Sequence, residues 1–196
     1  MRVEFDLPRR TAVAHAFAAL ALSLAPAQQA IAFGNRLPPD EAELKYKSPR
    51  TPGPKPTDIG PRNGIALKPC MDGKPHCFSS SPDVVDDDDA IEEPGMTGWL
   101  VPPFKYDKAL GEALGDLKAA VAAYPPGQRG IDGGGFKVID EREDGKMAYM
   151  YVQFESQRKG YIDDMEFALS EGTANVRTSS RLGYLDRGVN AKRYNW

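Results

Sequence analysis

Four strand-like runs follow one another at regular spacing in the C-terminal half of this 196-residue chain. Asp144-Gly145 separates the first two runs and is a strong signal for a tight hairpin turn. The other two connections are also short and hydrophilic, and links of this length join only antiparallel neighbours. The pattern therefore predicts a four-stranded antiparallel meander sheet. Its strands are expected at 136–142, 146–155, 161–169 and 174–180.

A single amphipathic helix is predicted ahead of the sheet at residues 105–124, so the expected fold class is α+β, with this helix packed on one face. Apolar side chains recur there at steps of three or four, which forms one stripe along a helix. The stripe consists of Leu110, Leu114, Leu117, Val121 and Tyr124. Asp107 is expected to cap the start of the helix and Pro125-Pro126 to end it. Gly111 and Gly115, four residues apart, predict a site of close packing.

Residues 1–32 have the pattern of an export signal rather than of a folded segment. Arg9 and Arg10 precede an apolar run at 12–25, and Ala30-Ile31-Ala32 forms a signal-peptidase site. Paired arginines before a weakly hydrophobic, Ala-rich run favour a twin-arginine-type signal; a short Ala-rich helix of the mature protein is the alternative. The run is too short for a bilayer, which needs about twenty residues, so no transmembrane span is expected in the mature chain. Export by this route leads to a thylakoid lumen or a bacterial periplasm.

Residues 33–62 form a Pro-rich arm. Its prolines are Pro38, Pro39, Pro49, Pro52, Pro54, Pro56 and Pro61. Each proline lacks a backbone donor and biases its predecessor towards extended geometry, so neither a helix nor a central strand is expected. The arm should sample solvated polyproline II, either as a plain linker or as a ligand for a groove on a partner. The folded α+β domain is expected to occupy residues 63–196.

Cys70 and Cys77 are the two cysteines of the chain. In an exported protein such a pair is expected to form one disulfide, here closing the small loop 70–77. A zinc site would recruit His76, but structural zinc needs four ligands, and no further cysteine or histidine remains once the signal is removed. Neither a metal nor a cofactor is therefore expected.

Residues 83–93 contain seven acidic side chains and are expected to form a solvated acidic loop. They lack the ligand spacing and the glycine of an EF-hand, so at most weak attraction of cations follows. The whole chain has a formal net charge of -3 and an isoelectric point near 5.5. This balance argues against nucleic-acid binding, which requires basic surfaces.

Alternation of side chains places acidic residues of the third strand on both faces of the sheet. Asp163 is expected on the helix side, at the edge of the core, whereas Asp164 and Glu166 point the other way. Arg177 and Arg181 share one side of the fourth strand and suit bidentate pairing with carboxylates. The predicted polar cluster comprises Asp163, Asp164, Glu166, Arg177, Arg181, Asp186, Asn190 and Arg193. It is interpreted either as an ion-pair network that fastens the C-terminal segment to the sheet or as a binding site for a small anion or an acidic peptide terminus.

Two stretches of the domain carry a resemblance to a known family. Residues 161–167 read Tyr-Ile-Asp-Asp-Met-Glu-Phe, and residues 177–193 contain Arg-Thr-Ser-Ser-Arg followed by spaced Gly, Asp, Gly, Asn and Arg. This pattern resembles the signature of the domain of unknown function 1499 family, with Thr178 where serine is common. The segment from Cys70 to Ser80, in which two cysteines flank a proline and precede two serines, is similar to the family's upstream element. The resemblance implies a domain rather than an activity. Members with twin-arginine lumenal signals occur in photosynthetic eukaryotes, so it favours the thylakoid lumen over the periplasm.

Three functional hypotheses follow from these features, and no catalytic residue is predicted. The leading hypothesis is a non-catalytic soluble lumenal accessory protein that docks on a photosynthetic membrane complex, such as a photosystem, through residues 33–62. The alternative is a small-molecule or anion-binding domain of the lumen or periplasm, conceivably a hydrolase, that uses Arg177, Arg181 and the facing carboxylates. A third hypothesis is a redox-responsive element based on the Cys70–Cys77 disulfide.

Overall fold

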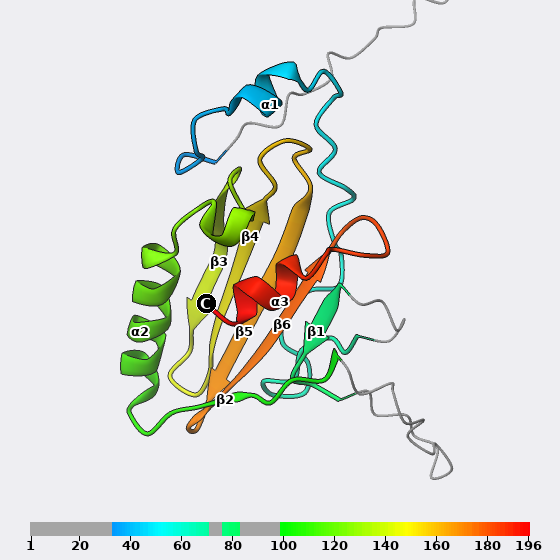
Figure 1. The fold of residues 1–196 in the computed structure, drawn as a ribbon. Coiled ribbons are helices and arrows are strands. Elements are labelled where there is room, and N and C mark those ends of the chain that lie inside the picture. The colour runs from blue at the N-terminus through cyan, green and yellow to red at the C-terminus, as the bar shows by residue number, and fades with distance from the viewer. Residues whose placement is uncertain (1–32, 71–75, 83–98) are drawn as a thin grey trace, which may run out of the picture.

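A computed structural model of the protein describes residues 33–70, 76–82 and 99–196. The predicted signal at 1–32 and the predicted acidic loop at 83–93 lie outside the described residues. The described part is built on one antiparallel sheet, with α2 on one of its faces and α3 close to β6 (Figure 1). No helix in these three ranges is long and apolar enough to cross a membrane.

The meander predicted from the turn signals is confirmed. Its strands are β3 (Gly135–Glu143), β4 (Ala148–Glu155), β5 (Ile162–Ser170) and β6 (Thr173–Ser180). Consecutive strands pair antiparallel throughout.

The predicted count of four strands is wrong, because the described residues form a six-stranded sheet. The two additional strands, β1 (Cys77–Ser79) and β2 (Phe104–Lys105), both pair antiparallel with β6. A bare β6 edge would present a row of unpaired backbone groups. Two segments too short to show a strand pattern cover that edge.

The predicted helix is present as α2 (Leu110–Ala123), five residues shorter at its start than expected. Its N-cap is Ala109, without a side-chain hydrogen bond, so the predicted capping role of Asp107 is wrong. The last helical residue is Ala123, and Tyr124 is the C-cap immediately before Pro125, as expected because proline lacks a backbone donor. A Cβ atom at Gly115 would meet nothing within 4 Å, so the expected close packing at the glycine pair is also wrong.

The arm 33–62 lies against the domain and contains a short helix, α1 (Glu41–Lys45). This corrects the prediction of a helix-free, solvated segment. The five residues of α1 fall between the prolines, and Asp40 caps the helix by accepting from the backbone of Glu43 at 2.6 Å. Backbone hydrogen bonds then tie the arm to the domain, from Leu37 to Gly133, from Thr51 to Lys159 and from Ile162 to Pro52.

Both faces of the sheet are covered. On one face, Met165, Phe167 and Leu169 of β5 pack in the main core with buried residues of α2, as the alternation predicted. On the other face, Tyr149, Tyr151 and Ala168 pack with Leu67. Ile59 and Ile65 complete this second core, so residues 59–67 cover the side of the sheet away from α2. The short 3-10 helix η2 (Gln128–Gly130) precedes the meander, and α3 (Val189–Tyr194) follows it.

Candidate functional site

The predicted polar cluster separates into two groups, one on each face of the sheet. The first group lies opposite α2 and includes Glu166, which is fully buried. The side chain of Glu166 accepts hydrogen bonds from Tyr149 Oη at 2.8 Å and from the Gly60 backbone at 2.6 Å. Arg177 Nη1 lies 3.6 Å from its second oxygen. Arg177, which was expected to pair with carboxylates of the neighbouring strand, therefore faces Glu166.

Asp164 and Arg181 complete the first group. Arg181 donates to both carboxylate oxygens of Asp164 at 2.7 Å, in the bidentate geometry that the guanidinium fork favours. Tyr151 Oη donates a short hydrogen bond to the same carboxylate. Burial, together with this bond to Asp164, raises the pKa of Tyr151 to about 12. The hydroxyl therefore stays protonated and keeps donating to Asp164.

The second group lies on the α2 side, at the end of β5. Arg193 is 4% exposed and donates to Asp132 at 2.5 and 2.8 Å and to Asp163 at 2.9 Å. Burial alone would lower the pKa of Arg193, but the charges of Asp132 and Asp163 outweigh it and raise that pKa. Asn190 accepts from Arg193 at 2.8 Å and donates to Asp186 at 2.9 Å. Asp132 was missed in the sequence because it stands in an irregular loop before β3.

These contacts favour the first of the two interpretations of the polar cluster. Arg181 and Arg193 are covered and direct their donors at carboxylates of the same chain. Arg193 reaches from α3 to the sheet, so it fastens the C-terminal segment. Arg177 is nearly covered, with 11% of its side chain exposed, although its Nε has no hydrogen-bond partner in the described part. An open anion site is not the geometry found here.

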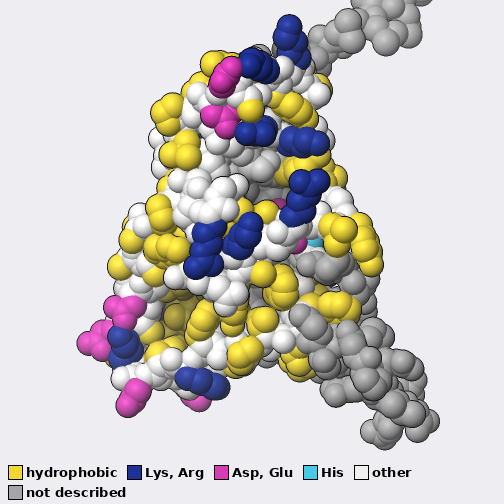
Figure 2. Space-filling view, viewed as in Figure 1, with side chains coloured by type: hydrophobic (Ala, Val, Ile, Leu, Met, Phe, Trp, Pro, Cys, Tyr) yellow, Lys and Arg dark blue, Asp and Glu magenta, His cyan; other side chains and the backbone are white. Residues whose placement is uncertain are grey.

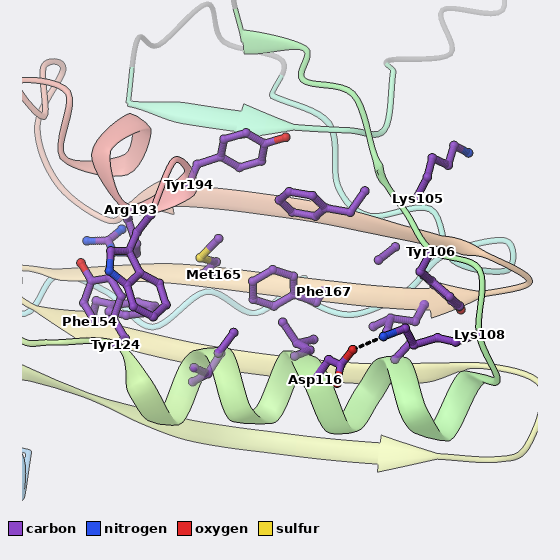
Figure 3. A pocket seen from close by; sticks show the side chains of 18 residues that line it. Lys105, Tyr106, Lys108, Asp116, Tyr124, Phe154, Met165, Phe167, Arg193 and Tyr194 are labelled. Atoms are coloured by element: carbon purple, nitrogen blue, oxygen red, sulfur yellow. Dashed lines mark hydrogen bonds and ion pairs between the residues drawn. The ribbon is translucent and has the colours of Figure 1, made fainter.

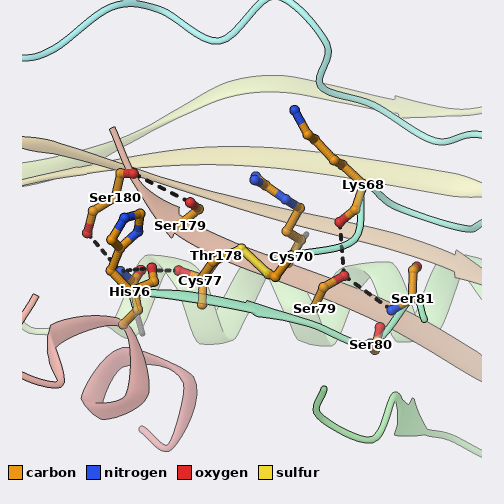
Figure 4. Close-up of a disulfide and its surroundings, with 12 residues drawn as sticks. Lys68, Cys70, His76, Cys77, Ser79, Ser80, Ser81, Thr178, Ser179 and Ser180 are labelled. Carbon is orange, nitrogen blue, oxygen red and sulfur yellow. Dashed lines mark hydrogen bonds between the residues drawn. A yellow bond between two sulfur atoms is a disulfide. The ribbon is translucent and has the colours of Figure 1, made fainter. Parts of the chain in front are cut away.

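The predicted disulfide between Cys70 and Cys77 is confirmed, with the two Cα atoms 5.8 Å apart (Figure 4). Serines that follow it hold the preceding segment in place: Ser81 Oγ accepts from the Leu67 backbone at 2.7 Å and Ser79 Oγ donates to the Lys68 carbonyl at 3.0 Å. Within the described ranges no three histidine, cysteine, aspartate or glutamate side chains lie together in a way that could hold a metal ion.

A cavity of about 500 Å³ lies between α2 and the sheet, and no sequence pattern predicted it. Figure 2 shows a hollow lined by hydrophobic side chains beside α2, with charged side chains along its lower rim. Its floor includes Met165, Phe167 and Leu169 of β5. The strand β2 and the C-terminal residues Tyr194 and Trp196 line its other sides.

The cavity has two chemically different ends (Figure 3). At one end, the ring of Tyr124 meets those of Phe154 and Trp196 edge-on, each with centroids 5.2 Å apart. At the other end lie Lys105, Tyr106, Lys108 and Asp116, where Lys108 pairs with Asp116. We call these the aromatic end and the lysine end. Along one wall, the rings of Phe104 and Tyr194 stack at 5.3 Å.

Small side chains on α2 leave this space open. Ala113 and Ala120 line the cavity, each with a side chain of a single carbon. The apolar stripe of the helix indicated a filled core. The cavity could not be predicted from it, because periodicity shows which side chains face inward and not whether they contact a partner. The signals available in the sequence were the alanines beside the stripe, Ala113 and Ala120, and the aromatic residues Tyr194 and Trp196.

The fold and these sites define an α+β domain with buried ion pairs and an apolar cavity on one face of an antiparallel sheet. A family model described as "Protein of unknown function (DUF1499)" matches residues 66–196, and the chain belongs to this family. No curated protein and no solved structure matches the chain significantly.

Proposed function

We propose that this protein binds an apolar small molecule in the cavity between α2 and the sheet. The observation that carries the proposal is the cavity itself: about 500 Å³, walled by aliphatic and aromatic side chains. Ligand pockets fall in the range of about 300–1,000 Å³ and are lined mainly by apolar groups with a few polar ones. This function corresponds to the small-molecule alternative, but at a different place from the polar cluster.

Energetics support an occupant. Side chains that border open space lose dispersion contacts with the partners they lack, and apolar area left facing water is unfavourable. Apolar hollows rimmed by polar groups are typical of ligand-binding grooves. The walls are held by elements that do not depend on the ligand, since the Arg193 ion pairs fix α3 and the meander fixes the floor.

Docking on a photosynthetic membrane complex through residues 33–62, and location in a thylakoid lumen or periplasm, stay predictions. The arm directs several of its groups at its own domain: Arg50 pairs with Glu155, which is buried, and Gly60 donates to Glu166. Only surfaces of the arm that point outwards, such as Leu44 at 70% exposure, are available to a partner.

Fluorescence titration with neutral N-phenylnaphthylamine tests the binding proposal. The probe is expected to brighten on entering the cavity of the wild-type protein. Ala120→Trp places an indole in the cavity and should weaken binding about tenfold or more, equivalent to at least roughly 1.4 kcal/mol. Ala122→Trp makes the same change at an exposed position of α2 that does not line the cavity, and should leave binding unchanged.

Two results would contradict the proposal. One is a wild-type protein that does not enhance the fluorescence of the probe. The other is equal loss of binding in both tryptophan variants, or in neither, because the site would then lie outside the cavity. Circular dichroism of each variant confirms that the fold is retained before the titrations are compared.

A further inference from the structure

Resting on the proposed function, we propose that the ligand is a single-chain amphiphile with an anionic head, held with its head at the lysine end and its tail towards the aromatic end. A fatty acid has this chemistry. The proposal follows from three observations: the charge at each end of the cavity, a buried hydroxyl without a partner, and the shape of the space between.

The charged side chains that line the lysine end are Lys105, Lys108 and Asp116, and the charge of Glu112, which does not line the cavity, also acts on Lys108. Lys105 Nζ donates to Thr173 Oγ1 at 2.8 Å, and no carboxylate among the described residues lies within ion-pair distance of it. Lys108 pairs with Asp116, so Lys105 is the lining side chain at this end whose positive charge is left for a ligand. These side chains are exposed enough to turn towards a ligand at the mouth.

The aromatic end offers no comparable charge. Arg193 lines the cavity there, but Asp132 and Asp163 bind its guanidinium and balance its charge. Its face also lies 4.4 Å from the centroid of the Phe154 ring. A ligand carboxylate at this end would meet two carboxylates already in place, so the head belongs at the opposite end.

Tyr106 supplies a second, independent observation at the lysine end. Its Oη is buried and has no hydrogen-bond partner in the described ranges. Leaving a buried hydroxyl unpaired costs about 1–3 kcal/mol, so such a group is expected to meet a ligand oxygen. Tyr106 is held in place by its backbone, which donates to the Gly172 carbonyl at 3.0 Å. The backbone of Tyr106 is therefore fixed before a ligand arrives.

The space between the ends suits one alkyl chain. Helix residues from Ala113 to Tyr124 line the cavity, which corresponds to roughly 16 Å at about 1.5 Å per residue. Met165 and Phe167 lie between the two ends in Figure 3, and both are apolar. A volume of about 500 Å³ fits one small molecule rather than a diacyl lipid.

Competition against N-phenylnaphthylamine tests the head group while the tail stays constant. Dodecanoate, dodecanol and dodecyltrimethylammonium are titrated below their micelle concentrations at near-neutral pH. Dodecanoate is expected to displace the probe at about tenfold lower concentration than the ammonium compound, as a charge-assisted hydrogen bond contributes about 1.5–3 kcal/mol. The preference should shrink as salt screens the exposed lysines.

Variants locate the head. Lys105→Gln should weaken the binding of dodecanoate several-fold and leave the binding of dodecanol unchanged. Tyr106→Phe should weaken the binding of both compounds, because it removes the hydroxyl that is expected to meet the head-group oxygen of either one. Lys118→Gln is the matched control, since Lys118 lies on α2, pairs with Glu141 and does not line the cavity. Probe binding by each variant shows that its cavity is intact.

The outcomes separate this inference from the proposed function. Probe binding with equal displacement by all three compounds, or with preference for the ammonium compound, overturns the anionic head and leaves the apolar site standing. A Lys105→Gln effect no larger than that of Lys118→Gln also overturns it. A wild-type protein that fails to bind the probe overturns the proposed function itself.

Discussion

The two faces of the sheet differ in how their buried side chains are paired and packed. The face covered by residues 59–67 holds Asp164 and Glu166, and their oxygens meet Arg181, tyrosine hydroxyls and a backbone amide. The face covered by α2 carries the Arg193 ion pairs at one end, is otherwise lined mainly by apolar side chains, and keeps a cavity of about 500 Å³. We call the first the polar face and the second the cavity face.

This difference follows from the directionality of the interactions. Burying a carboxylate without a partner is prohibitively costly in free energy. The carboxylates of a buried polar face must therefore be paired if the protein is to fold. Apolar packing is non-directional, and a missing neighbour costs only the contacts that it would have made. A face rich in charged residues can therefore be purely structural, while an apolar face can carry the binding site.

The largest expected effect is on the polar face, from Arg181→Ala. The substitution leaves Asp164 buried without its cation, so the free energy of unfolding should fall by about 3–5 kcal/mol. Arg158→Ala is the control, because the Arg158–Asp40 pair is about half exposed (54% and 47%) whereas Arg181 and Asp164 are 8% and 4% exposed. Its loss should be about 0–1 kcal/mol in urea unfolding. Equal losses would show that the polar face is hydrated and open.

Paired leucine truncations sharpen the comparison of packing. Leu67→Ala on the polar face removes a side chain that is 1% exposed and should cost about 2–5 kcal/mol. Leu117→Ala on the cavity face should cost about 1 kcal/mol, because Leu117 is half-buried and already borders open space. Thermal unfolding of the two variants measures the difference. A larger loss at Leu117 would mean that the cavity is filled in the folded protein.

The smallest effect is expected in alkaline solution and concerns the tyrosines of the polar face. Tyr151 has its pKa raised to about 12, from 10.0, by burial and by its bond to Asp164. The folded state therefore holds this proton more tightly than the unfolded state does. Stability should be unaffected below pH 10 and fall as pH rises from about 10 towards 12.

Unfolding monitored by phenolate absorbance measures this slope. Tyr151→Phe should make the decline above pH 10 shallower. A variant with the wild-type slope would show that Tyr151 is not a source of the alkaline loss, whatever its effect on stability at neutral pH.

Much of the fold could be predicted from residues close together in the chain. Asp144-Gly145 and the other short connections fixed the meander, and alternation placed Met165 and Phe167 against the helix. The strands β1 and β2 could not be predicted, because three-residue and two-residue segments carry no periodic pattern. Their pairing with β6 depends on a long-range contact.

The candidate site was less predictable than the fold. Side-chain alternation predicted that Arg177 and Arg181 share one side and could pair with carboxylates of the neighbouring strand, and it left open which carboxylate each would meet; the structure pairs Arg181 with Asp164. The cavity depends on the gap between α2 and the sheet, which is set by the packing of distant segments and not by the helix stripe. Tyr106 and Trp196, which line that gap, lie ninety positions apart in the chain.

The position of residues 59–65 has a practical consequence for recombinant work. The family match begins at residue 66, yet Gly60 donates to Glu166, and Ile59 and Ile65 pack on the second core. A gene fragment cut at the family boundary would strip that cover and leave tyrosine rings and a carboxylate facing water. Its product would be prone to aggregate, so a fragment meant to yield soluble protein should start at Phe33.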